Sequence, residues 1–246
     1  MMPEPTLTER QLRDLKLEAL AEFAAGAGHE INNPIATIVG RAALLLKDET
    51  DPERRRALET IGGQAYRVRD MIGDAMTFAR PSPPKLEPFF AAVEIERVLE
   101  TFRDRFERAA IVIEKQLDDS LQIEADREQF RVVISCLLKN ELEVLSNGSC
   151  VRLGLGALPE QASEFVLLTL SDDGPGLSVI EREHLFDPFY SGRQAGRGLG
   201  FGLSKCWRIV SLHGGWIDAT RSNQSGFSLQ CSWPRYLCSV ERSESR

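Results

Sequence analysis

One histidine stands in a setting suited to nucleophilic chemistry. His29 is followed by Glu30, and Asn33 and Pro34 come within the next turn of an expected helix. A neutral imidazole nitrogen can attack phosphorus, and an adjacent carboxylate can accept the other ring N–H and make the attacking nitrogen more reactive. Asn33 shares the helix face of His29, where its amide could position water. Taken alone, His29 is equally well an ordinary exposed residue and Pro34 a simple kink.

A loop after an expected strand has the residues of a purine site. It reads Asp172-Asp173-Gly174-Pro175-Gly176. A buried carboxylate at a strand end, here Asp172, can accept a hydrogen bond from an adenine amino group. Gly174 and Gly176 would let the backbone come close to the base.

A second glycine-rich segment opens an expected helix. Exposed backbone N–H groups at a helix start form an anion site suited to a triphosphate. The candidate residues of this segment are Gly198, Leu199, Gly200, Gly202 and Leu203.

Three more residues complete the predicted nucleotide site. Asn140, on an expected amphipathic helix, offers an oxygen ligand of the kind that Mg²⁺ prefers, and Lys139 offers positive charge to phosphates. Phe189 belongs to an aromatic segment, 185–190, between the two glycine loops. Each element alone is also typical of an ordinary turn or helix, whereas their order along one chain predicts binding of ATP with Mg²⁺.

The elements that would position His29 are two long helices. Apolar residues recur every seven positions from Leu17 to Leu45, with Ile35 and Ala42 in a companion row, and a second helix repeats the pattern from Leu58 to Ala79. The polar segment 47–52 ends the first helix. Thr50 or Asp51 can cap the second helix, with Pro52 at its first position. Such a hairpin cannot enclose a core, so we expect a homodimeric four-helix bundle.

The rest of the chain predicts an α/β sandwich. Helical patterns at 95–109, 128–145 and 202–212 alternate with short strand patterns at 111–113, 121–123, 151–155, 165–170, 217–220 and 227–233. The proline-rich segment 81–84 would separate the two parts. The predicted organisation is a hairpin domain over 1–81, a nucleotide-binding domain over 85–235 and a disordered tail over 236–246.

Composition excludes several functional classes. The net charge of −7 argues against a nucleic-acid binder, and no apolar run is long enough to span a membrane. The five cysteines show no metal-binding or disulfide spacing, which predicts reduced, mostly buried thiols in a cytoplasmic protein. His184 and His213 are predicted to be structural, and the three tryptophans are predicted to belong to the core.

These motifs resemble, in order and over nearly the whole chain, the sensor histidine kinases of two-component systems. His29-Glu30-Ile31-Asn32-Asn33-Pro34 is similar to their H box, Asn140 falls at the magnesium ligand of the N box, and 172–176 and 198–203 are similar to the two glycine boxes. Residues 186–189 are similar to the F box. The fold implied is α+β, an antiparallel helical hairpin in a dimeric bundle followed by a Bergerat-type ATP-binding domain related to those of gyrase and MutL.

The resemblance also implies an activity and partners. His29 would be autophosphorylated from ATP, with Asp172 reading adenine, and would pass the phosphoryl group to an aspartate of a response-regulator receiver domain. The 81–84 segment would act as the hinge. Input would come from a sensor domain absent from this sequence or from a separate sensor protein.

Two positions depart from the family pattern. Cys136 stands where a first asparagine is usual, and Glu141 stands where alanine is usual. Two alternatives therefore stay open: a catalytically impaired interaction or phosphatase protein of the same fold, and an ATPase that hydrolyses ATP with water.

Overall fold

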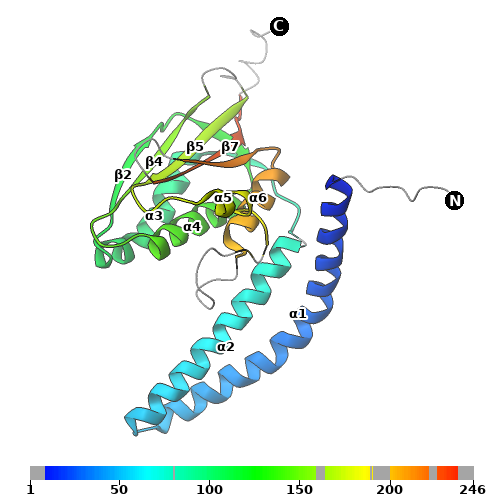
Figure 1. Cartoon of the computed structure of the whole chain (residues 1–246), viewed down its shortest axis with the longest axis vertical. Helices are drawn as coiled ribbons and strands as arrows, with labels where there is room; N and C mark the ends of the chain where they lie inside the picture. Colours follow the sequence, from blue (N-terminus) through cyan, green and yellow to red (C-terminus); the bar gives the residue numbers. More distant parts are fainter. Residues whose placement is uncertain are drawn as a thin grey trace, which may run out of the picture. The chain divides into compact units, whose positions relative to one another are not determined.

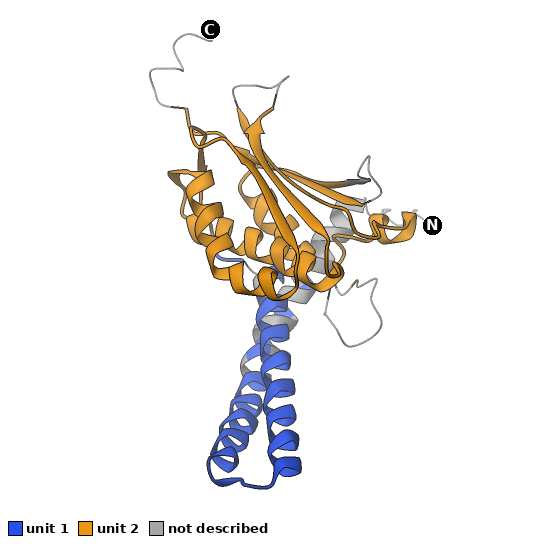
Figure 2. Ribbon diagram, turned by 90° about the vertical axis from the view of Figure 1, so that its left-hand side faces the viewer, with its two compact units in different colours: residues 1–82 blue, residues 83–246 orange. Residues whose placement is uncertain are grey.

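The computed structural model divides the chain into two compact units, residues 1–82 and 83–246 (Figure 2). The structure describes residues 9–79, 81–158, 164–188, 190, 200–221 and 226–237. Side chains are not described at 9–18, 20, 21, 23–25, 27, 29, 77, 79, 220 and 221.

The first unit is a helical hairpin, as predicted (Figure 1). Helix α1 spans Glu9–Asp48 and contains Pro34, and α2 spans Pro52–Ala79. Asp51 is the cap between them, because its Oδ1 accepts hydrogen bonds from the backbone N–H groups of Glu53 at 2.8 Å and Arg54 at 3.2 Å.

The two rows of the hairpin seam have different surroundings. Ile35 and Ala42, in the companion row of α1, are buried, and so is Ala65 on α2. In the seven-residue row, Ile38 is 45% exposed and Leu45 is 59% exposed. A single hairpin therefore buries one row and leaves the other open to solvent.

The second unit is a mixed sheet covered on one face by helices (Figures 1 and 2). The five-stranded sheet has the order β2-β4-β5-β7-β6, in which only the β2–β4 pair is parallel. Its strands are β2 (Val112–Leu117), β4 (Cys150–Ala157), β5 (Phe165–Asp172), β6 (Ile217–Arg221) and β7 (Phe227–Pro234). The helices are α3 (Ala91–Arg108), α4 (Arg127–Val144), α5 (Val179–Glu183) and α6 (Gly202–Leu212).

Two elements of this unit are absent from the sequence prediction. Strand β1 (Glu87–Phe90) pairs antiparallel with β3 (Gln122–Ala125), and the short helix α5 follows a capping box between Ser178 and Glu181. Both elements are too short to show a clear period in the sequence.

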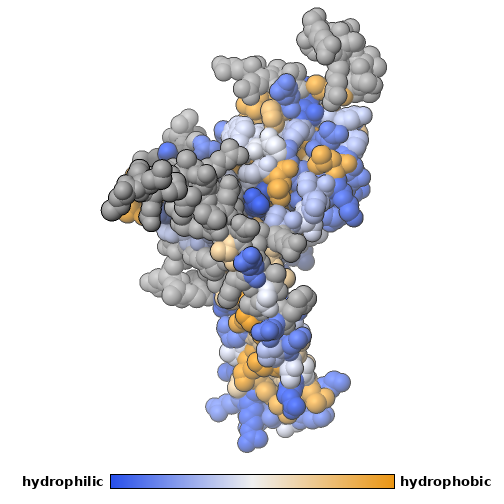
Figure 3. All heavy atoms as spheres, turned by 90° about the vertical axis from the view of Figure 1, so that its right-hand side faces the viewer, coloured by the Kyte–Doolittle hydropathy of each residue, from blue (hydrophilic) through white to orange (hydrophobic). Residues whose placement is uncertain are grey.

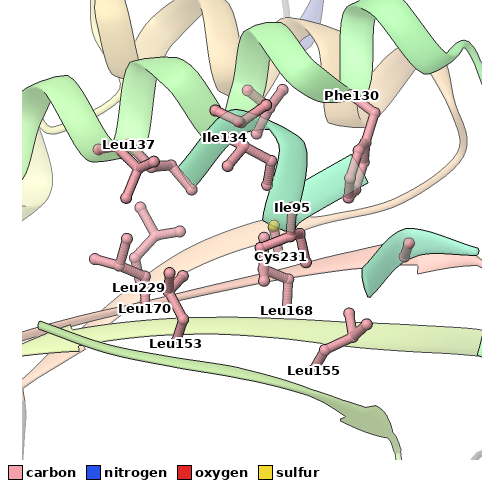
Figure 4. Close-up of a cluster of buried hydrophobic side chains, with 14 of the residues drawn as sticks. Ile95, Phe130, Ile134, Leu137, Leu153, Leu155, Leu168, Leu170, Leu229 and Cys231 are labelled. Carbon is pink, nitrogen blue, oxygen red and sulfur yellow. The ribbon is translucent and has the colours of Figure 1, made fainter. Parts of the chain in front are cut away.

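The core lies between the sheet and helices α3, α4 and α6. Alternate residues of β5 are buried, since one face of the strand meets the helices and the other does not. Figure 4 shows Ile134 and Leu137 of α4 directed toward Leu153, Leu168 and Leu229 of the sheet. At one end, the Phe130 and Trp233 rings meet edge to face, with centroids 4.9 Å apart.

Candidate active site

The segment around His29 lies in the middle of α1. The side chain of His29 is outside the described residues, whereas Glu30 and Asn33 are exposed. Pro34 has no N–H to donate to the carbonyl of Glu30, so the helix is weakened one turn after the histidine. The Thr37 hydroxyl donates to the carbonyl of Asn33 at 3.1 Å.

Close packing distinguishes the residue just before His29. Gly28 is buried, and a Cβ atom there would lie 2.5 Å from the Sδ atom of Met76 on α2. Any larger residue would displace the Met76 side chain or separate the helices. The turn that carries His29 therefore depends on a glycine for its contact with α2.

The Asp172 carboxylate lies buried at the end of β5, only 2% exposed. Its Oδ1 accepts hydrogen bonds from the backbone N–H groups of Gly174 at 2.6 Å and Phe227 at 3.3 Å. These bonds tie the first glycine loop to the start of β7. The orientation of the carboxylate is therefore fixed by the protein before any ligand binds.

Glycine is required at two positions around this carboxylate. Gly176 has φ +71°, a conformation that L side chains rarely adopt, and a Cβ at Gly226 would lie 2.0 Å from the carbonyl oxygen of Asp172. Gly226 was not predicted as a site residue, because the sequence gives no sign that it would pack against Asp172. The pairing of β5 with β7 brings it there.

Helix α4 brings its C-terminal half next to the same loop. A Cβ at Gly174 would lie 2.6 Å from the Cδ2 atom of Leu145, the residue that follows α4. On the last turns of α4, Asn140 is half-buried and Lys139 is exposed. Glu141 is 1% exposed, so its carboxylate is enclosed within the unit.

The start of α6 offers backbone donors. No described side chain caps this helix at Phe201, and Gly202, its first residue, is exposed. Ser204 donates instead to the carbonyls of Phe201 at 3.1 Å and Gly200 at 3.3 Å, and Gly200 has φ +69°. The first N–H groups of α6 are therefore not taken up by a side-chain cap, and Leu203 lies half-buried behind them.

Three predicted site residues fall in segments that the structure leaves out. Phe189, Gly198 and Leu199 lie outside the described residues. The remaining candidates of the nucleotide site come from the end of β5, the C-terminal half of α4 and the start of α6. Helices α4 and α6 are joined by a hydrogen bond from the Cys206 thiol to the carbonyl of Val133, with the sulfur 3.8 Å from the oxygen.

Two residues that were predicted to be structural fit that prediction. His213 is buried, its Nδ1 lies 2.8 Å from the carbonyl of Ile209, and its Nε2 accepts the Asp126 N–H at 2.9 Å. Trp233 is fully buried. Burial lowers the pKa of His213 and keeps the imidazole neutral.

The prediction that all three tryptophans belong to the core was wrong for Trp216. Its side chain is 40% exposed. It directly precedes β6, which is an edge strand of the sheet and has a neighbouring strand on one side only.

The described residues contain no group of three or more His, Cys, Asp or Glu side chains that could hold a metal ion. Asn140, the residue predicted to hold magnesium, would supply one amide oxygen beside phosphate oxygens and water. This donor set suits Mg²⁺, which usually keeps several waters and takes few protein ligands. In the part of the chain that the structure covers, no helix is both long and apolar enough to cross a membrane.

Comparison with known families accounts for both units. Residues 19–84 match the family model of the His Kinase A (phospho-acceptor) domain. Residues 125–237 match the model described as histidine kinase-, DNA gyrase B- and HSP90-like ATPase. The chain belongs to the sensor histidine kinases. Together the two matches cover most of this chain, in the order expected from its motifs.

Curated relatives agree with this assignment. The C4-dicarboxylate transport sensor protein DctB of Rhizobium meliloti is 32% identical over 86% of this chain. The signal transduction histidine-protein kinase AtoS of Escherichia coli is 26% identical over 85% of the chain. The chain spans about a third of the length of these two relatives, 34% in each case.

Solved structures share the fold. Full-length ShkA in complex with AMPPNP matches 88% of this histidine kinase core and 46% of its own chain, with a TM-score of 0.75 and 21% identity. Histidine kinase ThkA in complex with the response regulator protein TrrA matches 93% of this chain and 65% of its own, with a TM-score of 0.66 and 23% identity. The predicted architecture of a helical hairpin followed by an ATPase domain is confirmed.

Proposed function

We propose that this chain uses ATP to phosphorylate His29 and passes the phosphoryl group to an aspartate of a response-regulator receiver domain. The observation that carries the proposal is the buried, pre-oriented carboxylate of Asp172, whose glycine loop packs against the end of α4, in a chain whose other unit carries His29 on a phospho-acceptor hairpin. A cytoplasmic location stays a prediction.

In the proposed nucleotide site, Asp172 binds the base. Its Oδ1 is already engaged by two backbone N–H groups, which leaves Oδ2 to accept from the adenine amino group. Gly174 and Gly176 let the base lie against the backbone. The first N–H groups of α6, near Gly202, bind phosphate oxygens.

The phosphate side of the site is formed by α4. Asn140 would contribute one oxygen ligand to Mg²⁺, which neutralises phosphate charge when bound. Lys139 is exposed next to it and adds positive charge. Glu141 is enclosed in the unit, so its carboxylate does not open onto the solvent-exposed part of the site.

In the proposed reaction, a ring nitrogen of His29 attacks the γ-phosphorus in line. Glu30 accepts the proton from the other ring nitrogen. The bond from phosphorus to the bridging oxygen breaks, and ADP leaves with that electron pair. Most of the acceleration comes from positioning and charge neutralisation, because phosphoryl transfer needs little covalent assistance from the protein. Asn33, one turn on, would orient water for dephosphorylation of the partner.

The exposed row of the hairpin supports a homodimer. Among the apolar side chains of α1 and α2 that are more than a third exposed are two pairs spaced seven residues apart, and Figure 3 shows apolar surface on the hairpin. They are Ile38, Leu45, Ile61 and Val68. Pairing two hairpins would bury this row in a four-helix bundle. The likeness to ThkA, solved in complex with TrrA, supports a response regulator as the second partner.

A second candidate is favoured by Cys136 and Glu141, which depart from the family pattern beside the proposed magnesium ligand. In this alternative the chain dimerises and binds a regulator without phosphorylating itself. Incubation with γ-labelled ATP and Mg²⁺ decides between the two. The kinase predicts label that is acid-labile, alkali-stable and absent from His29→Gln. The alternative predicts an unlabelled protein that still binds its regulator, and a water-using ATPase predicts free phosphate alone.

A further inference from the structure

Two thiols face each other between the helices that form the proposed nucleotide site. Cys136 lies on α4, one turn before Asn140, and Cys206 lies on α6, one turn after Gly202. The Cys206 thiol donates to the carbonyl of Val133 on α4, with the sulfur 3.8 Å from the oxygen, and Val133 lies one turn before Cys136 on the same helix. The side-chain interaction with Cys136 is also the largest cause of the raised pKa of Cys206. The two sulfurs are therefore neighbours across the α4–α6 contact.

The two cysteines differ in access to solvent. Cys206 is fully buried, whereas Cys136 is half-buried. The hydrogen bond to Cys136 and burial together hold the pKa of the Cys206 thiol well above its ordinary value, so this thiol is not the one that solvent reagents meet first. Cys136 is the sulfur within reach of a small oxidant.

We propose that Cys136 and Cys206 are a peroxide-sensitive thiol pair, oxidised by hydrogen peroxide or an organic hydroperoxide to a disulfide that weakens nucleotide binding at the adjacent site. The effect on ATP rests on the proposed function, whereas formation of the disulfide does not.

The oxidation runs in two steps. The Cys136 sulfur attacks a peroxide oxygen, the O–O bond breaks, and Cys136 becomes a sulfenic acid while one water (or alcohol) leaves. The Cys206 sulfur then attacks the sulfenic sulfur, the S–O bond breaks and a second water leaves with the thiol proton. Two thiols have lost two electrons to one peroxide, and dithiothreitol reverses the change by thiol–disulfide exchange.

The disulfide changes the site through helix spacing. Sulfurs in hydrogen-bond contact are much farther apart than the about 2.05 Å of an S–S bond, so forming the bond draws α4 and α6 together. Asn140 and Gly202 each lie one turn from a bonded cysteine and move with it. Because phosphate binding depends on the spacing between these two helices, we expect the dissociation constant for ATP to rise about tenfold or more.

The test uses the full chain with and without hydrogen peroxide. Non-reducing peptide mapping by mass spectrometry should find a Cys136–Cys206 cross-link in the wild type, and titration with a fluorescent ATP analogue should show weaker binding that dithiothreitol restores. Cys136→Ser and Cys206→Ser should lose both effects, and serine at 206 retains a hydroxyl for the Val133 carbonyl. Cys150→Ser is the matched control, because Cys150 is also partly exposed but lies on β4.

The outcomes separate the two levels of the proposal. Failure to form the cross-link, in protein that still unfolds cooperatively, overturns the thiol pair. A cross-link with unchanged nucleotide affinity overturns the regulatory effect. Reduced protein that binds no nucleotide overturns the proposed function, and the peptide map then still decides whether the disulfide forms.

Discussion

Two substitutions of Asp172 should separate nucleotide recognition from stability. In Asp172→Asn the amide oxygen can still accept the N–H groups of Gly174 and Phe227, whose distances to the carboxylate Oδ1 are 2.6 and 3.3 Å. The second atom of the group changes from an acceptor to an N–H donor that faces the adenine amino group. The variant should therefore fold nearly as well as the wild type but lose a hydrogen bond to a charged acceptor.

The size of the binding effect follows from that one contact. A hydrogen bond to a charged group contributes about 1.5–3 kcal/mol, which corresponds to a roughly 10- to 150-fold rise in the dissociation constant for ATP. An amide N–H can instead donate to the oxygen of a guanine base. The preference for ATP over GTP should therefore shrink in Asp172→Asn.

Asp172→Ala should behave differently. It leaves two backbone donors without their carboxylate partner at a site where the original side chain is 2% exposed. Each orphaned N–H costs about 1–3 kcal/mol, and a domain of this size loses roughly 2–4 °C of melting temperature per kcal/mol. Calorimetric titration with ATP and GTP and thermal unfolding of both variants check the pair of expectations. Wild-type affinity in Asp172→Asn, or equal destabilisation by both substitutions, would refute the reasoning.

Three further perturbations test other parts of the structure. Glu94→Ala should lower the free energy of unfolding by about 3–5 kcal/mol in denaturant titrations. The reason is that its fully buried carboxylate lies 2.6–2.9 Å from the guanidinium groups of Arg97, Arg127 and Arg131. The control is Glu128→Ala, which removes an exposed partner of Arg131 and should change the free energy of unfolding by less than about 1 kcal/mol. Burial depresses the pKa of His213 despite the nearby Asp126 carboxylate. The neutral imidazole therefore stabilises the fold fully above the unfolded pKa of about 6.5, and this stabilisation is lost as the pH falls below that value. Between pH 7 and pH 5 the melting temperature should drop more in the wild type than in His213→Gln, and the same pH dependence in both proteins would contradict this. Ile38→Asp should convert a dimer to monomers in light scattering while Arg41→Ala does not, and a dimer in both would mean that the exposed row of the hairpin is not the interface.

Much of the fold could be predicted because its period is visible in the sequence. The two hairpin helices, the α4 pattern and the alternating strands each repeat over enough residues to be assigned. The capping function of Asp51 was also within reach, since an acidic residue before Pro52 is a common helix start. What periodicity could not tell was which apolar row of the hairpin is buried within one chain, because both rows carry the same residue types.

Features that depend on long-range packing could not be predicted. The buried Glu94 is held by arginines from α3 and α4, and the sequence shows only one charged residue among many. The approach of Gly226 to Asp172 requires that β5 and β7 be neighbours, although they are far apart in the chain. The contact between Cys136 and Cys206 likewise exists only once α4 and α6 pack together.

For the nucleotide site, the sequence predicted the residue types, and the structure adds the reason for their placement. Asp172 and Asn140 come from different elements, yet Gly174 packs against the end of α4 and brings the two regions together. Their roles toward ATP and Mg²⁺ remain proposals, as does that of His29.

The most direct test of the central claim is to map the phosphoryl group itself. The full chain is incubated with ATP and Mg²⁺, digested at neutral to alkaline pH, and analysed by mass spectrometry with fragmentation that preserves phosphohistidine. We predict phosphate on His29 in the wild type and, at limiting ATP, about tenfold less or lower still in the same peptide of Asp172→Asn. Phosphate on a serine, threonine or different histidine, or release of inorganic phosphate from an unmodified protein, would contradict the account.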